Sequence, residues 1–346
     1  MTQQAPSNPL PAILLGARAG LILHQTLYVA AKLGIADQLE GGWRSAAELA
    51  RQLEVNEDAL YRTLRLLASQ GIFEENSSRS FRNNAVSHFL RTGVPGSLRS
   101  LFLFWGSDFH YPSFGKIMHS IRTGESSRTL LSGTDSFEHL RRDPEQARIF
   151  DDAMTAMSQL VGPAIATAYD FGAWGSLMDV GGGNGILLSH ILRVHPALRG
   201  VLADQEHVLE RAREHGYLGG DLAARTTMQP CNFFEHVPPG CKAYVMKSVI
   251  HDWDDDQARI ILANCRKAIP PDGVLLVVEW DLFSENVPSN GKFIDIVMLI
   301  LTGGRERSVD EYRELLASTG FRLNRVIPTA AQLAVIEAFP IQETGV

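Results

Sequence analysis

A lone histidine ends an apolar stretch in the segment VMKSVIHDWDDDQAR, residues 245–259. The run AYVMKSVI before it has the composition of a buried strand, so we expect His251 at the carboxyl end of that strand. In open α/β sheets, ligands bind beyond the carboxyl ends of the strands. An imidazole placed there can accept a proton during a reaction, which makes His251 a candidate general base.

Two glutamates are candidates for supporting this histidine. Glu279 ends the strand-like run GVLLVVE and is expected at the same edge of the sheet. Glu306 lies in GGRERS, directly before a helical stretch, and its alternative role is a surface ion pair with Arg305 or Arg307. A carboxylate beside an imidazole holds the tautomer and stabilises the imidazolium that forms on proton uptake.

The aspartates that follow His251 have a structural explanation. Asp254 can cap a helix, and Asp255 and Asp256 then lie in its first turn, where carboxylates interact favourably with the helix dipole. The apolar face of this helix would consist of Ala258, Ile261, Leu262, Cys265, Ala268 and Ile269. We therefore expect no metal site among these aspartates.

A glycine-rich loop and one acidic residue fit a cofactor that contains a nucleoside. Gly181, Gly183 and Gly185 in LMDVGGGNG follow a strand and precede a helix, where glycine allows a tight turn against a ligand. Asp204 ends the next strand, where a carboxylate can accept hydrogen bonds from both ribose hydroxyls. The third glycine of the dinucleotide pattern G-x-G-x-x-G is replaced by Ile186. NAD therefore fits less well than S-adenosylmethionine, which has no phosphate to cradle.

Strands and helices alternate around these motifs from residue 171 to residue 346. LMDV, RGVLAD, AYVMKSVI and GVLLVVEW read as strands, with helical stretches between them. This alternation predicts an α/β domain with a doubly wound, mostly parallel sheet over residues 171–346. Residues 97–170 read as a mostly helical connector whose many aromatic residues could line a pocket for a flat ligand.

Residues 1–96 read as a separate domain. Ser45 with Glu48 fits a capping box, Asn56 opens the next helix, and IFEENSSRSFRNN looks like a hairpin with a Ser-rich turn. Helix, turn, helix and hairpin together make a winged helix. The helices expected at residues 10–40 have a broader apolar face than this domain needs, which favours an interface with a second chain.

Composition limits the partners and the compartment. The chain has 32 Lys and Arg against 39 Asp and Glu, a net charge of −7, which disfavours nucleic acid and anionic membranes as partners. Arg18 interrupts the apolar N-terminal run and no basic region precedes it, so we expect neither a signal peptide nor a membrane span. Cys231, Cys241 and Cys265 lack C-x-x-C spacing and are expected to be reduced, as in a cytoplasmic protein.

Taken together, the motifs resemble those of the metal-independent family of small-molecule O-methyltransferases. This family includes plant caffeic acid, animal acetylserotonin and bacterial natural-product methyltransferases. LMDVGGGNG, VLADQ, CNFF, KSVIHDWDDD and GGRERS occur in the family's order and at roughly its spacing, and the similarity covers nearly the whole chain. The resemblance implies a Rossmann-like class I methyltransferase domain with an N-terminal winged-helix dimerisation domain, and hence a homodimer.

The resemblance also implies roles for individual residues. His251, Glu279 and Glu306 match the family's catalytic histidine and the two glutamates that flank it. The positions that match its cofactor-binding residues are Asp179, Gly181, Gly183, Asp204, Gln205, Asn232, Phe233 and Lys247. The positions that match its substrate-binding residues are Trp105, Phe150, Met154 and Met298.

Two positions depart from the family pattern. Asn232 stands where the family has an acidic residue near the adenine, so cofactor binding could be weaker here. Glu206 replaces a proline after the Asp-Gln pair, which puts the local backbone geometry in doubt.

The function implied by the resemblance is transfer of a methyl group from S-adenosylmethionine to a hydroxyl of a small aromatic acceptor, phenolic or polyketide-like. The reaction would be an in-line displacement in which His251 takes the hydroxyl proton. Free imidazole has a pKa of about 6.5 and a phenol about 10, a mismatch of roughly 3.5 units or about 5 kcal/mol. The histidine therefore needs help from a carboxylate.

Three alternatives stay open. A member of the same family could methylate nitrogen or carbon, or could have drifted to bind the cofactor without this reaction. An NAD-dependent oxidoreductase is disfavoured by Ile186. A DNA-binding regulator is disfavoured because Glu57 and Asp58 balance Arg62 and Arg65 in the second helix of the winged helix.

Overall fold

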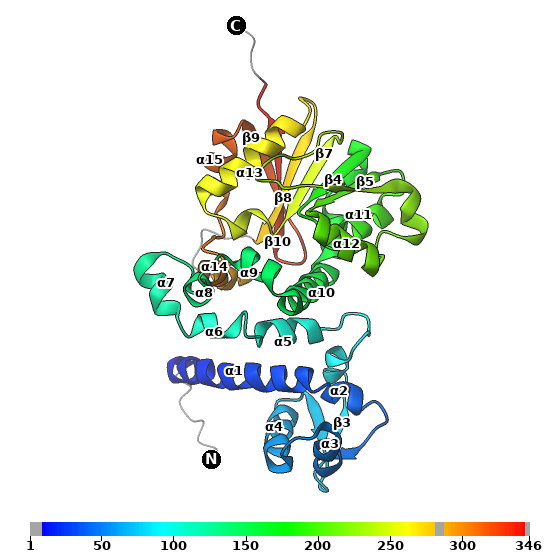
Figure 1. Ribbon diagram of the computed structural model, residues 1–346, viewed down its shortest axis with the longest axis vertical. Coiled ribbons are helices and arrows are strands. Elements are labelled where there is room, and N and C mark those ends of the chain that lie inside the picture. The colour runs from blue at the N-terminus through cyan, green and yellow to red at the C-terminus, as the bar shows by residue number, and fades with distance from the viewer. Residues whose placement is uncertain (1–8, 281–286, 343–346) are drawn as a thin grey trace, which may run out of the picture. The chain divides into compact units, whose positions relative to one another are not determined.

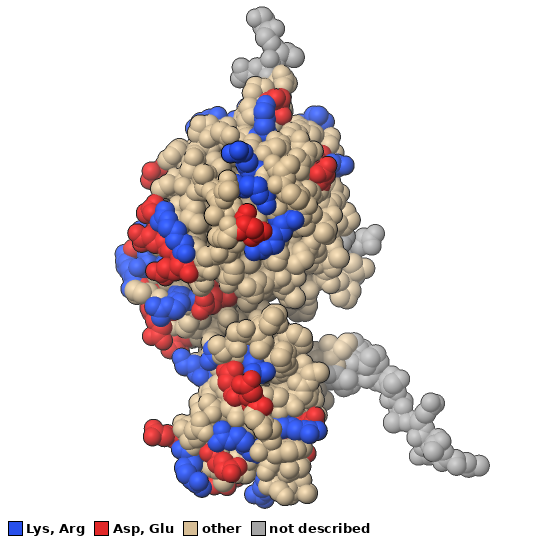
Figure 2. Space-filling view, turned by 90° about the vertical axis from the view of Figure 1, so that its right-hand side faces the viewer, with Lys and Arg blue, Asp and Glu red and all other residues tan. Residues whose placement is uncertain are grey.

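The computed structural model describes residues 9–280 and 287–342, and the chain divides into two compact units, Met1–Tyr111 and Pro112–Val346 (Figure 1). The division falls within residues 97–170, the stretch predicted as a connector. That stretch is mostly helical, as predicted. On the face in Figure 2, basic and acidic side chains lie interspersed on the surface, in keeping with a net charge of only −7.

The N-terminal unit contains the predicted helix, turn, helix and hairpin. Its elements are α1 (Pro9–Lys32), α2 (Ile35–Gln38), β1 (Arg44–Ser45), α3 (Ala46–Leu53), α4 (Glu57–Ser69), β2 (Phe73–Glu75), β3 (Ser80–Asn83), η1 (Ser87–Leu90) and α5 (Arg99–Trp105). The Ser45 hydroxyl accepts from the Glu48 N–H while the Glu48 carboxylate accepts from the Ser45 N–H, which confirms the capping box. The Asn56 side chain accepts from the Ala59 N–H at 2.9 Å and caps α4, without a reciprocal bond. The strands form a small antiparallel sheet in the order β1-β3-β2.

Helix α1 carries many exposed apolar side chains. They are Ile13, Leu14, Leu15, Leu21, Ile22 and Val29. Among the described residues, α1 is the one helix that is long and apolar enough over Ile13–Lys32 to cross a membrane, judged by length and composition alone. A helix that packs against another protein chain can be equally long and apolar. Length and composition therefore fit a helix at a protein interface as well as a helix in a membrane.

A seven-stranded sheet forms the centre of the second unit. Its strands are β4 (Ser176–Val180), β5 (Arg199–Asp204), β6 (Thr226–Pro230), β7 (Ala243–Lys247), β8 (Val274–Trp280), β9 (Phe321–Pro328) and β10 (Leu333–Pro340). The strand order is β6-β5-β4-β7-β8-β10-β9. Strands β4 to β8 pair in parallel and β10 pairs antiparallel with both of its neighbours. The predicted doubly wound, mostly parallel sheet is confirmed.

Helices cover both faces of this sheet (Figure 1). Helices α13 (Asp255–Ala268) and α15 (Val309–Ser318) pack on one face. Helices α10 (Pro144–Ala168), α11 (Ile186–Val194) and α12 (Glu206–His215) pack on the other. The remaining helices are α6 (Tyr111–Phe114), α7 (Ile117–Thr123), α8 (Ser127–Ser132), α9 (Ser136–Arg142) and α14 (Asn290–Leu301). Of these, α8, α9 and α14 lie together, because Ser126 and Ser136 donate to carbonyl groups at the end of α14.

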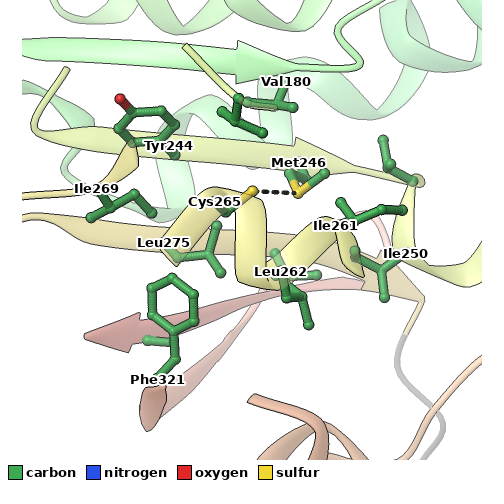
Figure 3. Close-up of a cluster of buried hydrophobic side chains, with 14 of the residues drawn as sticks. Val180, Tyr244, Met246, Ile250, Ile261, Leu262, Cys265, Ile269, Leu275 and Phe321 are labelled. Carbon is green, nitrogen blue, oxygen red and sulfur yellow. Dashed lines mark hydrogen bonds between the residues drawn. The ribbon is translucent and has the colours of Figure 1, made fainter. Parts of the chain in front are cut away.

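Helix α13 shows how the sequence after His251 builds the core. The Asp254 carboxylate accepts from the Gln257 N–H at 2.8 Å, which confirms the predicted cap. The apolar face of α13 then packs on β7 and β8, and the Cys265 sulfur lies 3.7 Å from that of Met246 (Figure 3). Ile250 belongs to the same buried cluster, so the residue before His251 is anchored in the core.

Candidate active site

The backbone turn that carries His251 begins earlier than the sequence predicts. The expected strand AYVMKSVI ends at Lys247, because Ser248 adopts a left-handed conformation with φ of 54°. The chain then forms a short 3₁₀ turn, η4 (Ile250–Asp252), that holds the imidazole of His251 almost fully buried. Three residues predicted as strand therefore form the turn that aims the histidine.

The Glu279 carboxylate holds this turn by accepting hydrogen bonds from the backbone of the turn. One carboxylate oxygen accepts from the N–H groups of Val249, Ile250 and His251 at 3.1, 3.0 and 3.4 Å. The other oxygen lies 3.5 Å from Nδ1 of His251. Burial raises the pKa of Glu279 to about 7, against the opposing effect of His251. This glutamate therefore fixes the position of the histidine and also faces its ring.

Glu306 makes the shortest contact with the histidine. Its Oε1 lies 2.6 Å from Nδ1 of His251, and both side chains are buried. The alternative role as a surface ion pair is wrong, because Arg305 pairs with Glu311 and Arg307 pairs with Asp255. Sequence reasoning thus placed Glu306 beside the correct partner from motif order alone.

The environment of Glu306 makes its negative charge costly. Burial raises the pKa of Glu306 to about 9, and the nearby carboxylate of Asp295 adds to the rise. The 2.6 Å contact between Nδ1 of His251 and Glu306 contains one proton. When this proton is on Nδ1, Glu306 is ionised, and Nε2 is then able to accept a second proton from a ligand. The imidazolium that forms on proton uptake then relieves the cost of this buried charge.

The loop GGRERS clamps the histidine turn from the other side. A Cβ on Gly304 would lie 2.1 Å from the carbonyl oxygen of His251, so only glycine fits there. The Arg305 N–H donates to the same carbonyl at 2.8 Å. The buried guanidinium of Arg307 donates to the carbonyls of Ile250 and Trp253 at 3.1 and 2.9 Å. Sequence reasoning missed Gly304 and Arg307, although both flank the predicted Glu306.

His251, Glu279 and Glu306 could together hold a metal ion, since their donor atoms all lie within 4.8 Å of one another. The details favour a proton. Zinc ligands at about 2.0–2.1 Å in a tetrahedron stand roughly 3.3 Å apart, whereas His251 Nδ1 and Glu306 Oε1 are 2.6 Å apart, a hydrogen-bond distance. One oxygen of Glu279 is also occupied by backbone donors. That the site works without a metal stays a prediction.

The glycine loop lies at the carboxyl end of β4. Gly181, Gly183 and Gly185 all have left-handed backbones, with φ of 70°, 57° and 77°, which explains why glycine occupies each position. The Asp204 carboxylate closes the loop, accepting from the Gly183 N–H at 2.9 Å and from the Gln205 N–H at 2.7 Å. Each oxygen keeps a second lone pair for a ligand hydroxyl. Gln205 itself is exposed at the start of α12.

Two acceptors beside this loop suit a cationic ligand. Oδ2 of Asp179 and Oδ1 of Asn184 are buried and have no hydrogen-bond partner among the residues that the structure describes. Burial raises the pKa of Asp179 to about 7, against the opposing charge of Lys247. Buried acceptors without donors are costly, and the ammonium group of S-adenosylmethionine would supply donors. The residues present therefore fit this cofactor.

Lys247 connects the cofactor side with the histidine side. Its Nζ donates to the Ser158 hydroxyl on α10 at 3.1 Å. Burial lowers the pKa of Lys247, while the carboxylates of Glu279 and Asp179 oppose this effect. The Lys247 ammonium group therefore interacts with Asp179 beside the glycine loop and with Glu279 beside His251.

The two residues predicted near the adenine behave differently. The Phe233 ring borders the glycine loop, since it would lie 3.5 Å from a Cβ on Gly181. Asn232 is exposed, and its amide donates to the Glu235 carboxylate at 2.8 Å. The Phe233 ring therefore lies beside the glycine loop, as predicted for a residue near the adenine. The Asn232 amide is instead hydrogen-bonded to Glu235.

Three of the four residues predicted to bind an acceptor lie on two helices of the second unit. Phe150 and Met154 lie on α10 and Met298 lies on α14. Phe137 contacts the rings of both Phe150 and Trp253, and Trp253 stands two residues after His251. Phe150 therefore belongs to an aromatic cluster next to the histidine turn.

Trp105 lies in the N-terminal unit, where its ring packs edge-on against Phe102. Its predicted contact with an acceptor stays a prediction, as do the acceptor roles of the other three residues.

Comparison with known families agrees with this geometry. Residues 115–322 match the profile of an O-methyltransferase domain, and residues 18–93 match that of an O-methyltransferase dimerisation domain. A phenazine O-methyltransferase from Lysobacter antibioticus is 38% identical over 98% of this chain and 98% of its own length. A phenazine-1-carboxylate N-methyltransferase from Pseudomonas aeruginosa is 31% identical over 90% of this chain and 92% of its own.

A solved structure shows the same fold. It is an O-methyltransferase from neocarzinostatin biosynthesis in complex with S-adenosylmethionine and 2-hydroxy-5-methyl naphthoic acid. The two chains are 33% identical and superpose with a TM-score of 0.80, over 94% of this chain and 98% of the other.

A substitution of Gly304 by Ala should lower turnover without unfolding the protein. The added Cβ would force the His251 carbonyl to move, since the two would be 2.1 Å apart. A shift of about 1 Å at a reacting group costs roughly 10²-fold in rate, and we expect a loss of that order. Steady-state kinetics measures it, with Gly41→Ala as a control, because a Cβ on Gly41 meets no atom within 4 Å. Equal rates for Gly304→Ala and wild type would contradict the clamp.

A substitution of Asp204 by Ala should weaken binding of S-adenosylmethionine by about 1–3 kcal/mol, because a charged acceptor is lost. Titration calorimetry gives the affinity directly. Glu210→Ala, an exposed acidic residue on α12, serves as the control for loss of charge. Unchanged affinity in Asp204→Ala would show that this carboxylate only closes the loop.

Proposed function

Because this chain belongs to the S-adenosylmethionine-dependent O-methyltransferase family, we propose that it methylates a hydroxyl of a small phenolic or polyketide-like acceptor, with His251 as general base. One observation carries this proposal. The imidazole of His251 is held at 2.6 Å by a buried glutamate, at the sheet edge where the glycine loop also ends. Such a pair has a purpose when a proton must be removed from a weakly acidic group.

The cofactor supplies a methyl group on a positively charged sulfur. Whenever Glu306 is ionised, the proton of this contact lies on Nδ1 of His251, so that Nε2 presents its lone pair. Nε2 would take the proton of the acceptor hydroxyl, and the bound cofactor would supply the methyl group to that oxygen and leave as its neutral, demethylated form. Glu279 and Glu306 both face the imidazolium and stabilise it. Alignment of the two reactants contributes most of the remaining acceleration.

The acceptor is proposed to be flat and aromatic. Phe150, Met154 and Met298 offer aromatic and thioether surfaces that suit an aromatic ring, and Trp105 is proposed to add to them. The relatives support this class, since their names specify a phenazine and a naphthoic acid.

Methylation of nitrogen is a second candidate, supported by the Pseudomonas relative that methylates phenazine-1-carboxylate on nitrogen. A ring nitrogen attacks through a free lone pair and needs no prior loss of a proton. A buried histidine with two carboxylates serves no such reaction, so the geometry favours a hydroxyl.

The chain carries a dimerisation domain, and we propose that it forms a homodimer in the cytoplasm. The exposed apolar side chains of α1 would then be buried against a second copy of the chain.

The proposed reaction is tested with a panel of phenolic, naphthoic and phenazine-type acceptors, S-adenosylmethionine, and a strong chelator in the buffer. We expect one acceptor class to gain the mass of one methylene on oxygen, because the site handles a proton rather than a metal. Mass spectrometry with fragmentation locates the methyl group. Methylation on nitrogen alone, or activity that a chelator abolishes, would overturn the corresponding part of the proposal.

A substitution of His251 by Ala should lower turnover by roughly 10²–10⁴-fold, the usual contribution of a general base, while cofactor affinity changes little. Glu306→Gln should show a smaller loss of the same kind. Single-turnover kinetics gives the rate of methyl transfer, and calorimetry gives the cofactor affinity. His236→Ala, which removes an exposed histidine, is the control. A folded His251→Ala protein with near-normal turnover would mean that the acceptor needs no base.

Substitution of Leu14 and Leu21 by Asp should dissociate the homodimer, because two charges would enter an apolar interface on α1. Sedimentation should give a dimer for the wild type and a species near the chain mass of 38.1 kDa for the variant. A wild-type monomer that stays fully active on dilution would show that the homodimer proposal is wrong.

A further inference from the structure

Helix α10 is held in two different ways along its length. Its C-terminal half is anchored in the apolar core, where Val161, Ile165 and Ala166 are fully or almost fully buried. Its N-terminal half carries Phe150 and Met154, the residues proposed to face the acceptor. The N-terminal half also buries Ala153 and Ala156, and it adds polar contacts that the C-terminal end lacks in the described part of the chain.

Three polar residues on one face of the N-terminal half make these contacts. Asp151, Thr155 and Ser158 follow the i, i+4, i+7 spacing of a single helix face. Each contacts a different element around the proposed cofactor site. Ser158 accepts from Lys247 of β7 at 3.1 Å, and Thr155 accepts from Asn184 of the glycine loop at 2.8 Å.

The outermost of the three contacts is an ion pair. Oδ2 of Asp151 lies 2.5 Å from Nε of Arg211 on α12, and the two side chains are only 15% and 27% exposed. Helix α12 begins two residues after Asp204, the residue proposed to bind the ribose. The pair therefore joins α10 to α12 beside the nucleoside end of the proposed site, one helical turn from the loop contact of Thr155.

Asp151 and Arg211 contact each other directly, and the Asp204 carboxylate lies within electrostatic reach of both side chains. Burial raises the pKa of Asp151 to about 6, and Arg211 opposes the rise. Neither sequence position belongs to the motifs of the glycine loop or the histidine turn.

We propose that Asp151 and Arg211 are positioning residues that clasp the N-terminal half of α10 against α12 and slow the release of the demethylated cofactor. This inference rests on the proposed function, because it takes the glycine loop and Asp204 as the cofactor site. When the clasp is open, α12 loses its ion pair with α10, while Thr155 and Ser158 keep their contacts with Asn184 and Lys247. Closing it shields the nucleoside end of the proposed cofactor site.

The test is the dissociation rate of S-adenosylhomocysteine from Asp151→Asn, Arg211→Met and the double variant, measured by stopped-flow displacement. We expect release about tenfold faster in each single variant, and no further gain in the double variant, because both remove the same interaction. The rate of methyl transfer in a single turnover should stay within about twofold. Asp151→Arg combined with Arg211→Asp should restore slow release in part.

Arg213→Met is the matched control, since Arg213 pairs with Glu206 within α12 at 2.9 Å and does not reach α10. Unchanged release in folded Asp151→Asn, or additive effects in the double variant, would overturn the clasp. Failure of the proposed function looks different: the wild-type protein itself would then not bind S-adenosylhomocysteine.

Discussion

The arrangement of the candidate active site depends on one contact, that of the buried Glu306 carboxylate with the imidazole of His251. Glu306 is almost completely buried at 2.6 Å from His251, and its negative charge is costly in that position. The surrounding structure has to keep the two groups in register, because a small displacement would leave a buried charge without its partner. Three separate segments of the chain meet around this one contact. They are the turn after β7, the end of β8 and the loop before α15.

Much of this architecture could be predicted because its signals are local. The three glycines of the loop need left-handed backbones, and only glycine adopts these without strain. The caps at Ser45 and Asp254 act over three residues, and the sequence shows both partners of each. The alternation of strands and helices can also be recognised segment by segment in the sequence, and it predicts the parallel sheet. Glu279 could be placed beside His251, because the carboxyl ends of parallel strands share one edge.

Other features could not be predicted, because they depend on contacts between distant segments. The strand before the histidine ends at Lys247 since Glu279, far along the chain, accepts from the turn's backbone. Nothing in the residues AYVMKSVI indicates that break. Gly304 and Arg307 act on the backbone around His251 from more than fifty positions away. The asparagine at position 232 shows the same limit, because its contact with Glu235 is visible only once the loop is folded.

The position of α10 suggests how one scaffold serves different acceptors. Most of the residues proposed to bind the cofactor lie at strand ends and on the glycine loop, next to the buried clusters of the core. The proposed acceptor residues Phe150 and Met154 instead lie on the N-terminal half of α10, which Asp151 and Thr155 join to α12 and the glycine loop. Substitutions on that half can reshape the acceptor side while the loop and the histidine turn stay in place. Since the same helix face also touches the cofactor elements, any such change is transmitted to cofactor binding. Acceptor preference and cofactor release should therefore vary together among variants of this helix.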